Sequence, residues 1–248
     1  MINRKETVRL AAIGDLHYPK ILPEKLPRLL SHITQQADVL LLCGDLTDYG
    51  RPEEAHALAR NLAANVKIPM LAVLGNHDYE AGQPQEVCKI LSEAGVVILD
   101  GDTYEVHEIG FAGVKGFAGG FGQYALQPWG ETAVKHFVHE AVDEALKLES
   151  ALAKLRTTQR VVLLHYAPIR ETVVGEPPEI FPFLGSSRLE EPLNRYAVTA
   201  VFHGHAHHGS PEGRTTAGIP VYNVAMPLLQ RTLAHQARFR IVDLPAAP

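Results

Sequence analysis

Cysteine is nearly absent from this sequence, with only Cys43 and Cys88 among 248 residues. Two cysteines cannot build a disulfide framework, and neither stands in the CxxC spacing of a cysteine metal site. Cys43 ends the apolar run VLLLC, and this position predicts a small packing residue rather than a reactive thiol. The cysteine count therefore excludes a disulfide-rich fold.

Long hydrophobic runs are missing as well. Apolar runs such as 96–99 and 161–164 are far shorter than the roughly 18 residues that a membrane-spanning helix needs. The first residues, MINRKETVRL, are polar and charged and contain no apolar segment of the kind that marks a secretory signal. We therefore expect no membrane association and a cytoplasmic location.

The sequence also contains no cluster of basic residues. Lys and Arg number 23 against 28 Asp and Glu, which gives a formal net charge of -5 at pH 7. Because long nucleic acids are usually bound through clustered Lys and Arg, a nucleic-acid partner is disfavoured and a small-molecule partner is expected.

The remaining composition is that of a globular protein, since 46% of the residues are hydrophobic and 21% are charged. The length suits one α/β domain, and no repeat or linker divides the chain, so residues 1–248 are predicted to form a single domain. Histidine is the unusual residue, with 13 copies. Histidine side chains bind metals and transfer protons near neutral pH, so their positions along the chain matter.

Strand-length apolar runs alternate with helical patterns along most of the chain. The predicted buried strands are 8–13, 38–43, 69–74, 160–165 and 198–203, and the predicted helices are 24–36, 52–64, 84–94 and 131–156. Strands that alternate with helices indicate βαβ units and an α/β fold.

Further short strands indicate a second sheet or an antiparallel edge. The β-leaning segments are 97–99, 104–109 and 111–117, and the strands expected to close the second sheet are 219–225 and 239–244. Ser187 and Glu190 predict a capped helix over 188–196. Two irregular segments remain, the glycine-aromatic loop 116–130 and the proline-rich loop 166–187, and long loops of this kind are often functional lids.

Polar side chains follow five of the predicted strands, where ligands bind in α/β sheets. These side chains are Asp15, His17, Asp45, Asn76, His77, His165, His205 and His207. Carboxylate, amide and imidazole groups form a mixed nitrogen and oxygen set that suits divalent first-row metals. All of these residues except His77 are candidate ligands, which is more than one catalytic ion uses. Two ions that share a bridging carboxylate would use all seven and could generate a hydroxide nucleophile for phosphate-ester hydrolysis.

Five short blocks at these strand ends resemble the signature of the calcineurin-like metallophosphoesterases: DLH at 15–17, GD at 44–45, GNHD at 75–78, the single His165, and GHAH at 204–207. The resemblance implies a four-layer αββα sandwich of two mixed β-sheets flanked by helices. It also implies a dinuclear phosphoesterase that acts by attack of a metal-bridging hydroxide, with Mn, Fe or Zn as the two divalent metal ions.

The same resemblance implies a role for each residue. The ligands of one ion would be Asp15, His17 and His207, those of the other would be Asn76, His165 and His205, and Asp45 would bridge the two. His77 would stand beside the substrate phosphate and stabilise charge or protonate the leaving oxygen. The carboxylate of Asp48 would orient His77.

Departures from the family pattern narrow the choice of substrate. Tyr49 stands where the family's protein phosphatases carry arginine, Asp78 stands where they carry glutamate, and Asp48 replaces the tyrosine ligand of the purple acid phosphatases. Among the remaining branches of the family, the sequence resembles the small bacterial phosphodiesterases, so a phosphodiester substrate is favoured. The alternatives are a phosphomonoesterase or protein phosphatase of the same fold, and a non-catalytic binding scaffold. Outside this set, Asp78 is predicted to be a turn residue and His203 a packed core histidine.

Overall fold

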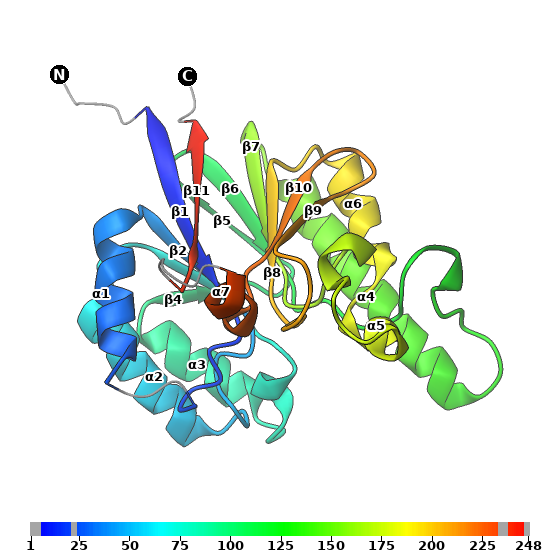
Figure 1. Cartoon of the computed structure of the whole chain (residues 1–248), viewed down its shortest axis with the longest axis horizontal. Coiled ribbons are helices and arrows are strands. Elements are labelled where there is room, and N and C mark those ends of the chain that lie inside the picture. Colours follow the sequence, from blue (N-terminus) through cyan, green and yellow to red (C-terminus); the bar gives the residue numbers. More distant parts are fainter. Residues whose placement is uncertain (1–5, 21–23, 233–237, 246–248) are drawn as a thin grey trace.

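The computed structural model describes residues 6–20, 24–232 and 238–245 and contains two β-sheets (Figure 1). The first sheet has the order β11-β1-β2-β3-β4, with β1 (Thr7–Ile13), β2 (Val39–Cys43), β3 (Met70–Val73), β4 (Val96–Ile98) and β11 (Arg240–Pro245). The second has the order β5-β6-β7-β8-β10-β9, with β5 (Asp102–Val106), β6 (Ile109–Gly113), β7 (Gln159–Leu163), β8 (Ala200–His203), β9 (Glu212–Arg214) and β10 (Pro220–Asn223).

Both sheets are mixed. Strands β1 to β4 pair in parallel, and β11 adds an antiparallel strand at the outer side of β1. In the second sheet β6, β7, β8 and β10 are parallel, while β5 and β9 are antiparallel edges. The parallel strands therefore present their carboxyl ends at one edge of each sheet, as predicted for βαβ units.

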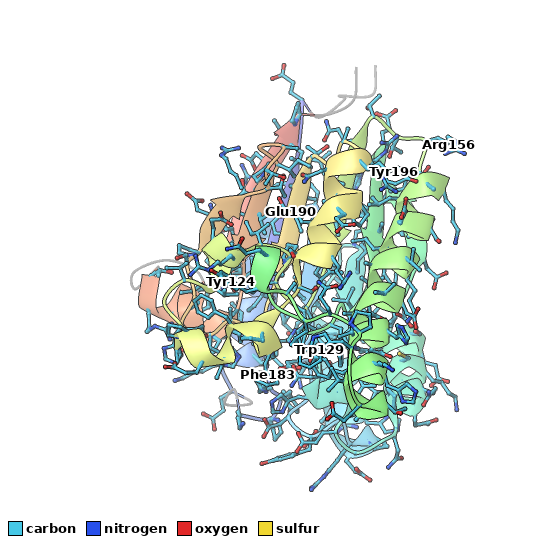
Figure 2. All side chains as sticks on the ribbon, turned by 90° about the vertical axis from the view of Figure 1, so that its right-hand side faces the viewer. Tyr124, Trp129, Arg156, Phe183, Glu190 and Tyr196 are labelled. Carbon is cyan, nitrogen blue, oxygen red and sulfur yellow. The ribbon has the colours of Figure 1, made fainter. Side chains whose placement is uncertain are left out.

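Helices cover the outer faces of both sheets. The helices α1 (Leu26–Gln36), α2 (Pro52–Asn65) and α3 (Pro84–Glu93) lie on the first sheet, and α4 (Thr132–Lys154) and α6 (Glu190–Arg195) lie on the second. Figure 2 shows α4 and α6 side by side over the second sheet. The shorter elements are α5 (Phe181–Leu184), α7 (Met226–Thr232), and the 3₁₀ turns η1 (His77–Tyr79), η2 (Gly122–Tyr124), η3 (Arg170–Val173), η4 (Pro178–Ile180) and η5 (Ser187–Leu189).

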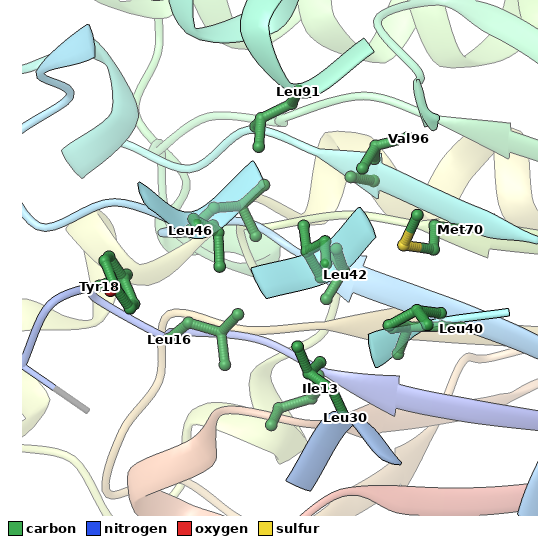
Figure 3. Packing of buried hydrophobic residues seen from close by; sticks show 14 of the residues in the cluster. Ile13, Leu16, Tyr18, Leu30, Leu40, Leu42, Leu46, Met70, Leu91 and Val96 are labelled. Atoms are coloured by element: carbon green, nitrogen blue, oxygen red, sulfur yellow. The ribbon is translucent and has the colours of Figure 1, made fainter. Parts of the chain in front are cut away.

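Three hydrophobic layers hold this arrangement together, because strand side chains alternate between the two faces of a sheet. In β2, Leu40 and Leu42 pack against the helical side with Leu30 of α1 (Figure 3). Leu41 and Cys43 of the same strand point into the layer between the two sheets. A third cluster joins the second sheet to α4. The four-layer αββα sandwich is therefore confirmed, and so is the packing role of Cys43, whose side chain is buried.

The sequence misplaced two strands. Residues 97–99 were expected in a second sheet or at an antiparallel edge, but β4 pairs in parallel with β3 of the first sheet. Residues 239–244 were expected to close the second sheet, and this prediction is wrong, because β11 pairs antiparallel with β1 of the first sheet. Hydrophobic patterning identifies a strand but carries no information about which sheet accepts it. The helix α7, which precedes β11, had no sequence prediction.

Two local boundaries also differ. The predicted strand 104–109 runs through a hairpin turn, because His107 and Glu108 both adopt positive φ (53° and 64°) between β5 and β6. A two-residue turn of this kind normally carries Asn or Gly, so the sequence contains no turn signal there. The predicted helix over 188–196 begins as η5 and continues as α6, and its cap is Ser186, which accepts a bond from Arg188 N, rather than Ser187. In the part of the chain that the structure covers, the helices are too short or too polar to cross a membrane.

Candidate metal centre

The carboxyl ends of five strands from both sheets bring the predicted polar residues together. From the first sheet, β1 leads to Asp15 and His17, β2 to Asp45, and β3 to Asn76 and His77, and from the second, β7 leads to His165 and β8 to His205 and His207. Contacts link residues far apart in the sequence. His207 Nε2 lies 2.9 Å from Asp15 Oδ1, and His165 Nε2 lies 2.9 Å from Asn76 Oδ1.

Among the residues that the structure describes, ligand-type atoms form three overlapping clusters in this region. The clusters are Asp15, His17 and His207; His17, Asp45 and His77; and Asp45, His165 and His205, each with its ligand atoms within 4.8 Å of one another. The first is one of the ligand sets that the family resemblance implies, and the third contains His165 and His205 of the other set together with Asp45, the expected bridge. Asp45 and His17 each belong to two clusters, so these residues lie between two potential ion positions.

In two histidines the neighbouring carbonyl oxygen determines which ring nitrogen carries the proton. His165 Nδ1 lies 3.0 Å from the carbonyl oxygen of Cys43, and His205 Nε2 lies 3.1 Å from that of Phe183. A carbonyl oxygen can only accept, so these nitrogens donate and the opposite nitrogen of each neutral ring keeps its lone pair. In His165 that lone pair faces Asn76 Oδ1, another acceptor, as two ligands of one cation would.

His17 supplies a further sign that the residues suit a cation. Both of its ring nitrogens are buried without a hydrogen bond to the described residues. Nε2 lies 3.7 Å from Asp45 Oδ2, and Nδ1 lies 3.4 Å from Asp48 Oδ1. Buried polar atoms are normally paired, and the lone pair of an unpaired imidazole beside a carboxylate is a site that a metal ion satisfies.

The pKa values agree with this interpretation. Burial lowers the pKa of His17 to about 4 and places the pKa of His165 well below its ordinary value, so both rings are neutral near pH 7. Burial together with the nearby Asp15 carboxylate raises the pKa of Asp45 well above its ordinary value. Burial also opposes ionisation of Asp15, but its hydrogen bond to His207 and the surrounding imidazoles outweigh burial and lower its pKa. A bound cation would favour the ionised form of both carboxylates.

The backbone at this centre adopts a conformation that side chains other than glycine rarely take. Positive φ angles occur at Asp15 (57°), His17 (43°), Asp45 (48°) and His205 (69°). Such residues cost on the order of 1–2 kcal/mol each and cluster at functional sites, where the surrounding structure enforces them. The turns that follow these strands therefore lower the stability of the fold, and they fix the direction in which the candidate ligand side chains point.

Two of the sequence blocks begin with a glycine that leaves room for a carboxylate of another loop. A Cβ at Gly75 would lie 2.2 Å from Asp45 Oδ1, and a Cβ at Gly204 would lie 2.4 Å from Asp15 Oδ2. Both contacts are too short for any side chain, so glycine is required here for close approach rather than for flexibility.

Asp78 connects two ligand loops, although its position predicted only a turn residue. Its buried carboxylate accepts bonds from the main-chain N–H groups of Leu46, Thr47 and Gly75 at 3.2, 2.8 and 2.8 Å, and from the Thr47 hydroxyl at 2.6 Å. These bonds join the loop that carries Asp45 to the loop that carries His77. No sequence signal beyond its adjacency to His77 marked this role.

We expect Asp78→Ala to destabilise the metal-free protein by about 3–5 kcal/mol, because it leaves four buried donors without an acceptor. Asp78→Asn keeps the shape and one acceptor oxygen, so its loss should be smaller. Urea unfolding in the presence of a chelator measures both. Equal stability of Asp78→Ala and the wild type would contradict the connecting role.

His77 is held by the loop that follows β2. Its Nδ1 lies 2.7 Å from the main-chain oxygen of Asp48 and 3.3 Å from Glu80 Oε2, and its backbone N–H donates to Asp45 Oδ1 at 2.9 Å. The family resemblance implies that the carboxylate of Asp48 orients His77, and the structure differs on this point. That carboxylate faces His17 Nδ1 and pairs with Lys20 Nζ at 2.7 Å. Sequence reasoning singled out neither Lys20 nor Glu80.

His203 is a packed core histidine, as predicted. Its buried ring contacts Thr172 Oγ1 and the carbonyl oxygen of Gly204, both at 2.8 Å. Burial lowers the pKa of His203 to about 4. The ring is therefore neutral in the folded protein at pH values where an unfolded chain would already bind a proton.

We expect two buried histidines to make the metal-free protein less stable as the pH falls from about 6.5 toward 4. Between these values the unfolded chain takes up protons at His17 and His203 that the folded chain excludes, so the contribution of these two histidines to the free energy of unfolding decreases with decreasing pH. Each unit of difference in pKa corresponds to about 1.4 kcal/mol. Urea midpoints measured with a chelator at several pH values give the slope, which His203→Gln should reduce. A slope that His203→Gln leaves unchanged would contradict the expectation.

Comparisons with known proteins agree with these observations. The sequence profile of a family described as calcineurin-like phosphoesterase matches residues 8–209, which include all of the candidate ligands. A protein of Rhodococcus erythropolis named a probable cyclic nucleotide phosphodiesterase is 25% identical over 219 residues, which cover 86% of this chain and 65% of the relative. The chain thus spans just under two thirds of that relative's length.

Two solved structures share the fold. The phosphopantetheinyl hydrolase of Mycobacterium tuberculosis superposes with a TM-score of 0.69 at 17% identity, over 96% of both chains. A protein of Thermus thermophilus superposes with a TM-score of 0.57 at 15% identity, over 97% of this chain and 100% of the other. At these identities the likeness concerns the fold alone.

Proposed function

Because this chain belongs to the calcineurin-like phosphoesterase family, we propose that it is a dinuclear metal-dependent enzyme that hydrolyses a small phosphodiester. The observation that carries the proposal is the position of Asp45, whose carboxylate belongs to two overlapping clusters of ligand atoms, one with His17 and the other with His165 and His205. A carboxylate shared by two clusters is what two neighbouring ions require.

The residues divide between two ion positions. Asp15, His17 and His207 would hold one divalent ion, Asn76, His165 and His205 the other, and Asp45 would contact both. When bound, the ions supply Lewis acidity and lower the pKa of water. Mn, Fe and Zn all accept this set of nitrogen and oxygen ligands.

Asp48 would position a ligand in this scheme. If His17 binds an ion through Nε2, its Nδ1 carries a proton that points at Asp48 Oδ1, 3.4 Å away. A carboxylate behind a metal-binding imidazole fixes the tautomer and the orientation of the ring. The same residue orients His77 through its main-chain oxygen, so Asp48 would serve both residues.

His77 would act on the substrate itself. Its Nδ1 faces the carbonyl oxygen of Asp48, so Nε2 is the ring nitrogen left for the phosphate. The protonated ring would donate from Nε2 to a phosphoryl oxygen or to the leaving oxygen. Glu80 Oε2 lies 3.3 Å from the same ring nitrogen, Nδ1.

Two observations favour a diester over a monoester. The relative from Rhodococcus erythropolis is named as a phosphodiesterase. In addition, Tyr49 stands at the position where the resemblance places the arginine of the protein phosphatases, which disfavours a protein phosphatase among the monoesterases.

The test compares initial rates of metal-free protein reconstituted with Mn²⁺ on bis(4-nitrophenyl) phosphate and on 4-nitrophenyl phosphate. We expect a clear preference for the diester. A preference for the monoester would assign a phosphatase of the same fold. An absence of turnover with Mn²⁺, Fe²⁺ and Zn²⁺ would contradict the proposal and favour a binding scaffold.

A further inference from the structure

An exposed arginine lies at the rim of the candidate metal centre. The helix α7 is anchored there by its first residue, Met226, whose N–H donates to the carbonyl oxygen of Gly14 at 3.0 Å, next to the ligand Asp15 (Figure 1). From the last turn of α7, Arg231 donates through Nη2 to the carbonyl oxygen of His207, and its side chain is exposed. This bond fixes the guanidinium beside a candidate ligand.

A lysine lies beside the neighbouring ligand. Lys20 Nζ is 2.7 Å from Asp48 Oδ1, which is itself 3.4 Å from His17 Nδ1, and the Lys20 side chain is 62% exposed. The rings of His17 and His207 meet edge to face, with centroids 5.4 Å apart. Because both histidines belong to the same cluster of ligand atoms, Lys20 and Arg231 border the same potential ion position.

The neighbours of the other ion position are mainly aromatic. The Tyr166 ring lies 4.5 Å from that of His205, and Phe183, whose carbonyl oxygen is 3.1 Å from His205 Nε2, is 58% exposed. Lys115 on this side is buried, with its Nζ bound to the carbonyl oxygen of Gly116 and 5.4 Å from the centre of the Tyr166 ring. The two sides of the centre thus differ, since one is bordered by exposed cations and the other by aromatic rings.

The carboxylates near the two exposed cations are engaged by other groups of the protein. Glu176 is buried and accepts from His208 N at 2.6 Å, Asp48 is buried, and Glu80 Oε2 faces His77 Nδ1 at 3.3 Å. An arginine side chain carries five N–H groups and a lysine three, and the bonds described above use one of each. A guanidinium binds a carboxylate or a phosphate through two parallel N–H bonds, and a nearby ammonium adds a point charge.

We propose that Arg231, together with Lys20, binds a second anionic group, a carboxylate or a further phosphate, carried on one arm of the phosphodiester substrate. The phosphodiester itself would lie at the metal centre, and its other arm would lie toward Phe183. The identity of the substrate rests on the proposed function, whereas binding of a ligand with two anionic groups does not require hydrolysis. Arg231 is the specificity-determining residue.

The first test measures binding of two phosphonates, which resist hydrolysis, to the metal-loaded protein by calorimetry. 4-Phosphonobutyrate and butylphosphonate differ only in a terminal carboxylate. We expect 4-phosphonobutyrate to bind about fivefold more tightly, the effect of a favourable exposed ion pair, and the difference to decrease at high ionic strength. Arg231→Gln should remove most of this preference, Arg231→Lys should keep part of it, and Lys20→Met should reduce it. Arg60→Gln removes an exposed arginine elsewhere, on α2, and should leave the preference unchanged.

The second test uses two diesters with the same leaving group, 3-carboxypropyl 4-nitrophenyl phosphate and butyl 4-nitrophenyl phosphate. We expect kcat/KM to favour the carboxylate diester about fivefold, Arg231→Gln to reduce this ratio, and Arg60→Gln to keep it.

The outcomes separate this inference from the proposed function. Hydrolysis of both diesters with a ratio near one, or with a ratio that Arg231→Gln leaves unchanged, would overturn the inference and leave the proposed function intact. Preferential binding of 4-phosphonobutyrate that Arg231→Gln removes, without hydrolysis of either diester, would support the anion site and contradict the proposed function.

Discussion

Replacement of Asp45 by Asn is expected to lower phosphodiester hydrolysis by about three orders of magnitude or more. Asp45 is the carboxylate common to two ligand clusters, and Asn offers a neutral oxygen in place of a charged one. Loss of the ions removes several kcal/mol of transition-state stabilisation, and each 1.36 kcal/mol corresponds to about a factor of ten. Initial rates and metal content of the purified variant, measured together, check this expectation.

The same substitution should not destabilise the metal-free protein. Burial and the nearby carboxylates of Asp15 and Asp78 raise the pKa of Asp45, so the ionised side chain opposes folding at neutral pH. Asn removes this charge and keeps the oxygen that accepts the bond from His77 N. We therefore expect the Tm of Asp45→Asn in a chelator to equal or exceed that of the wild type.

Added metal separates these two effects. Mn²⁺ should raise the Tm of the wild type, because a ligand that binds only the folded state stabilises it, and it should raise the Tm of Asp45→Asn much less. Asp102→Asn, at an exposed carboxylate on β5, serves as the control and should respond to Mn²⁺ as the wild type does. A wild-type response of Asp45→Asn would contradict the bridging role of Asp45.

Replacement of His77 by Ala is expected to lower kcat by about 100-fold or more, the usual contribution of a positioned acid. Its ring lies edge-on to His17, with centroids 4.6 Å apart, so it stands at the border of the metal centre. Both ions should remain, because the seven other candidate residues account for them. His56→Ala, on the exposed side of α2, is the control and should keep full activity.

Metal content decides what a loss of activity in this variant means. His77 also belongs to one of the three ligand clusters, with His17 and Asp45, so geometry alone leaves it a potential ligand. A variant that retains both ions but loses activity supports an acid that contacts the substrate. A variant that loses an ion shows that His77 is a ligand, and a fall in kcat of less than about threefold contradicts both roles.

The sequence predicted the strands that position the site better than it predicted their surroundings. The runs that end near Asp15, Asp45, Asn76 and His165 were each placed within two residues of the observed strands, because a strand buried on both faces has a continuous apolar signature. The location of the tail strand was wrong because it depends on a partner, β1, more than 200 residues earlier in the chain.

For the candidate site too, the sequence predicted some features and not others. The residues that follow each strand can be read locally from the sequence, and this was enough to name every member of the observed clusters. The function of Asp78 as a connection between two loops, and the direction of the Asp48 carboxylate toward His17, depend on loops that meet only in the folded chain.

The sequence by itself predicted an α/β fold and named the candidate ligand residues, because strand periodicity and the polar residues at strand ends are properties of neighbouring residues. The four-layer arrangement of two sheets was expected from the resemblance of the five short blocks to a known family. Only the tertiary structure decided the tautomers of His165 and His205 and the positive φ angles of four candidate ligands. Each of these depends on contacts between segments that are distant in the sequence. Such contacts exist only after hydrophobic burial has brought the two sheets together.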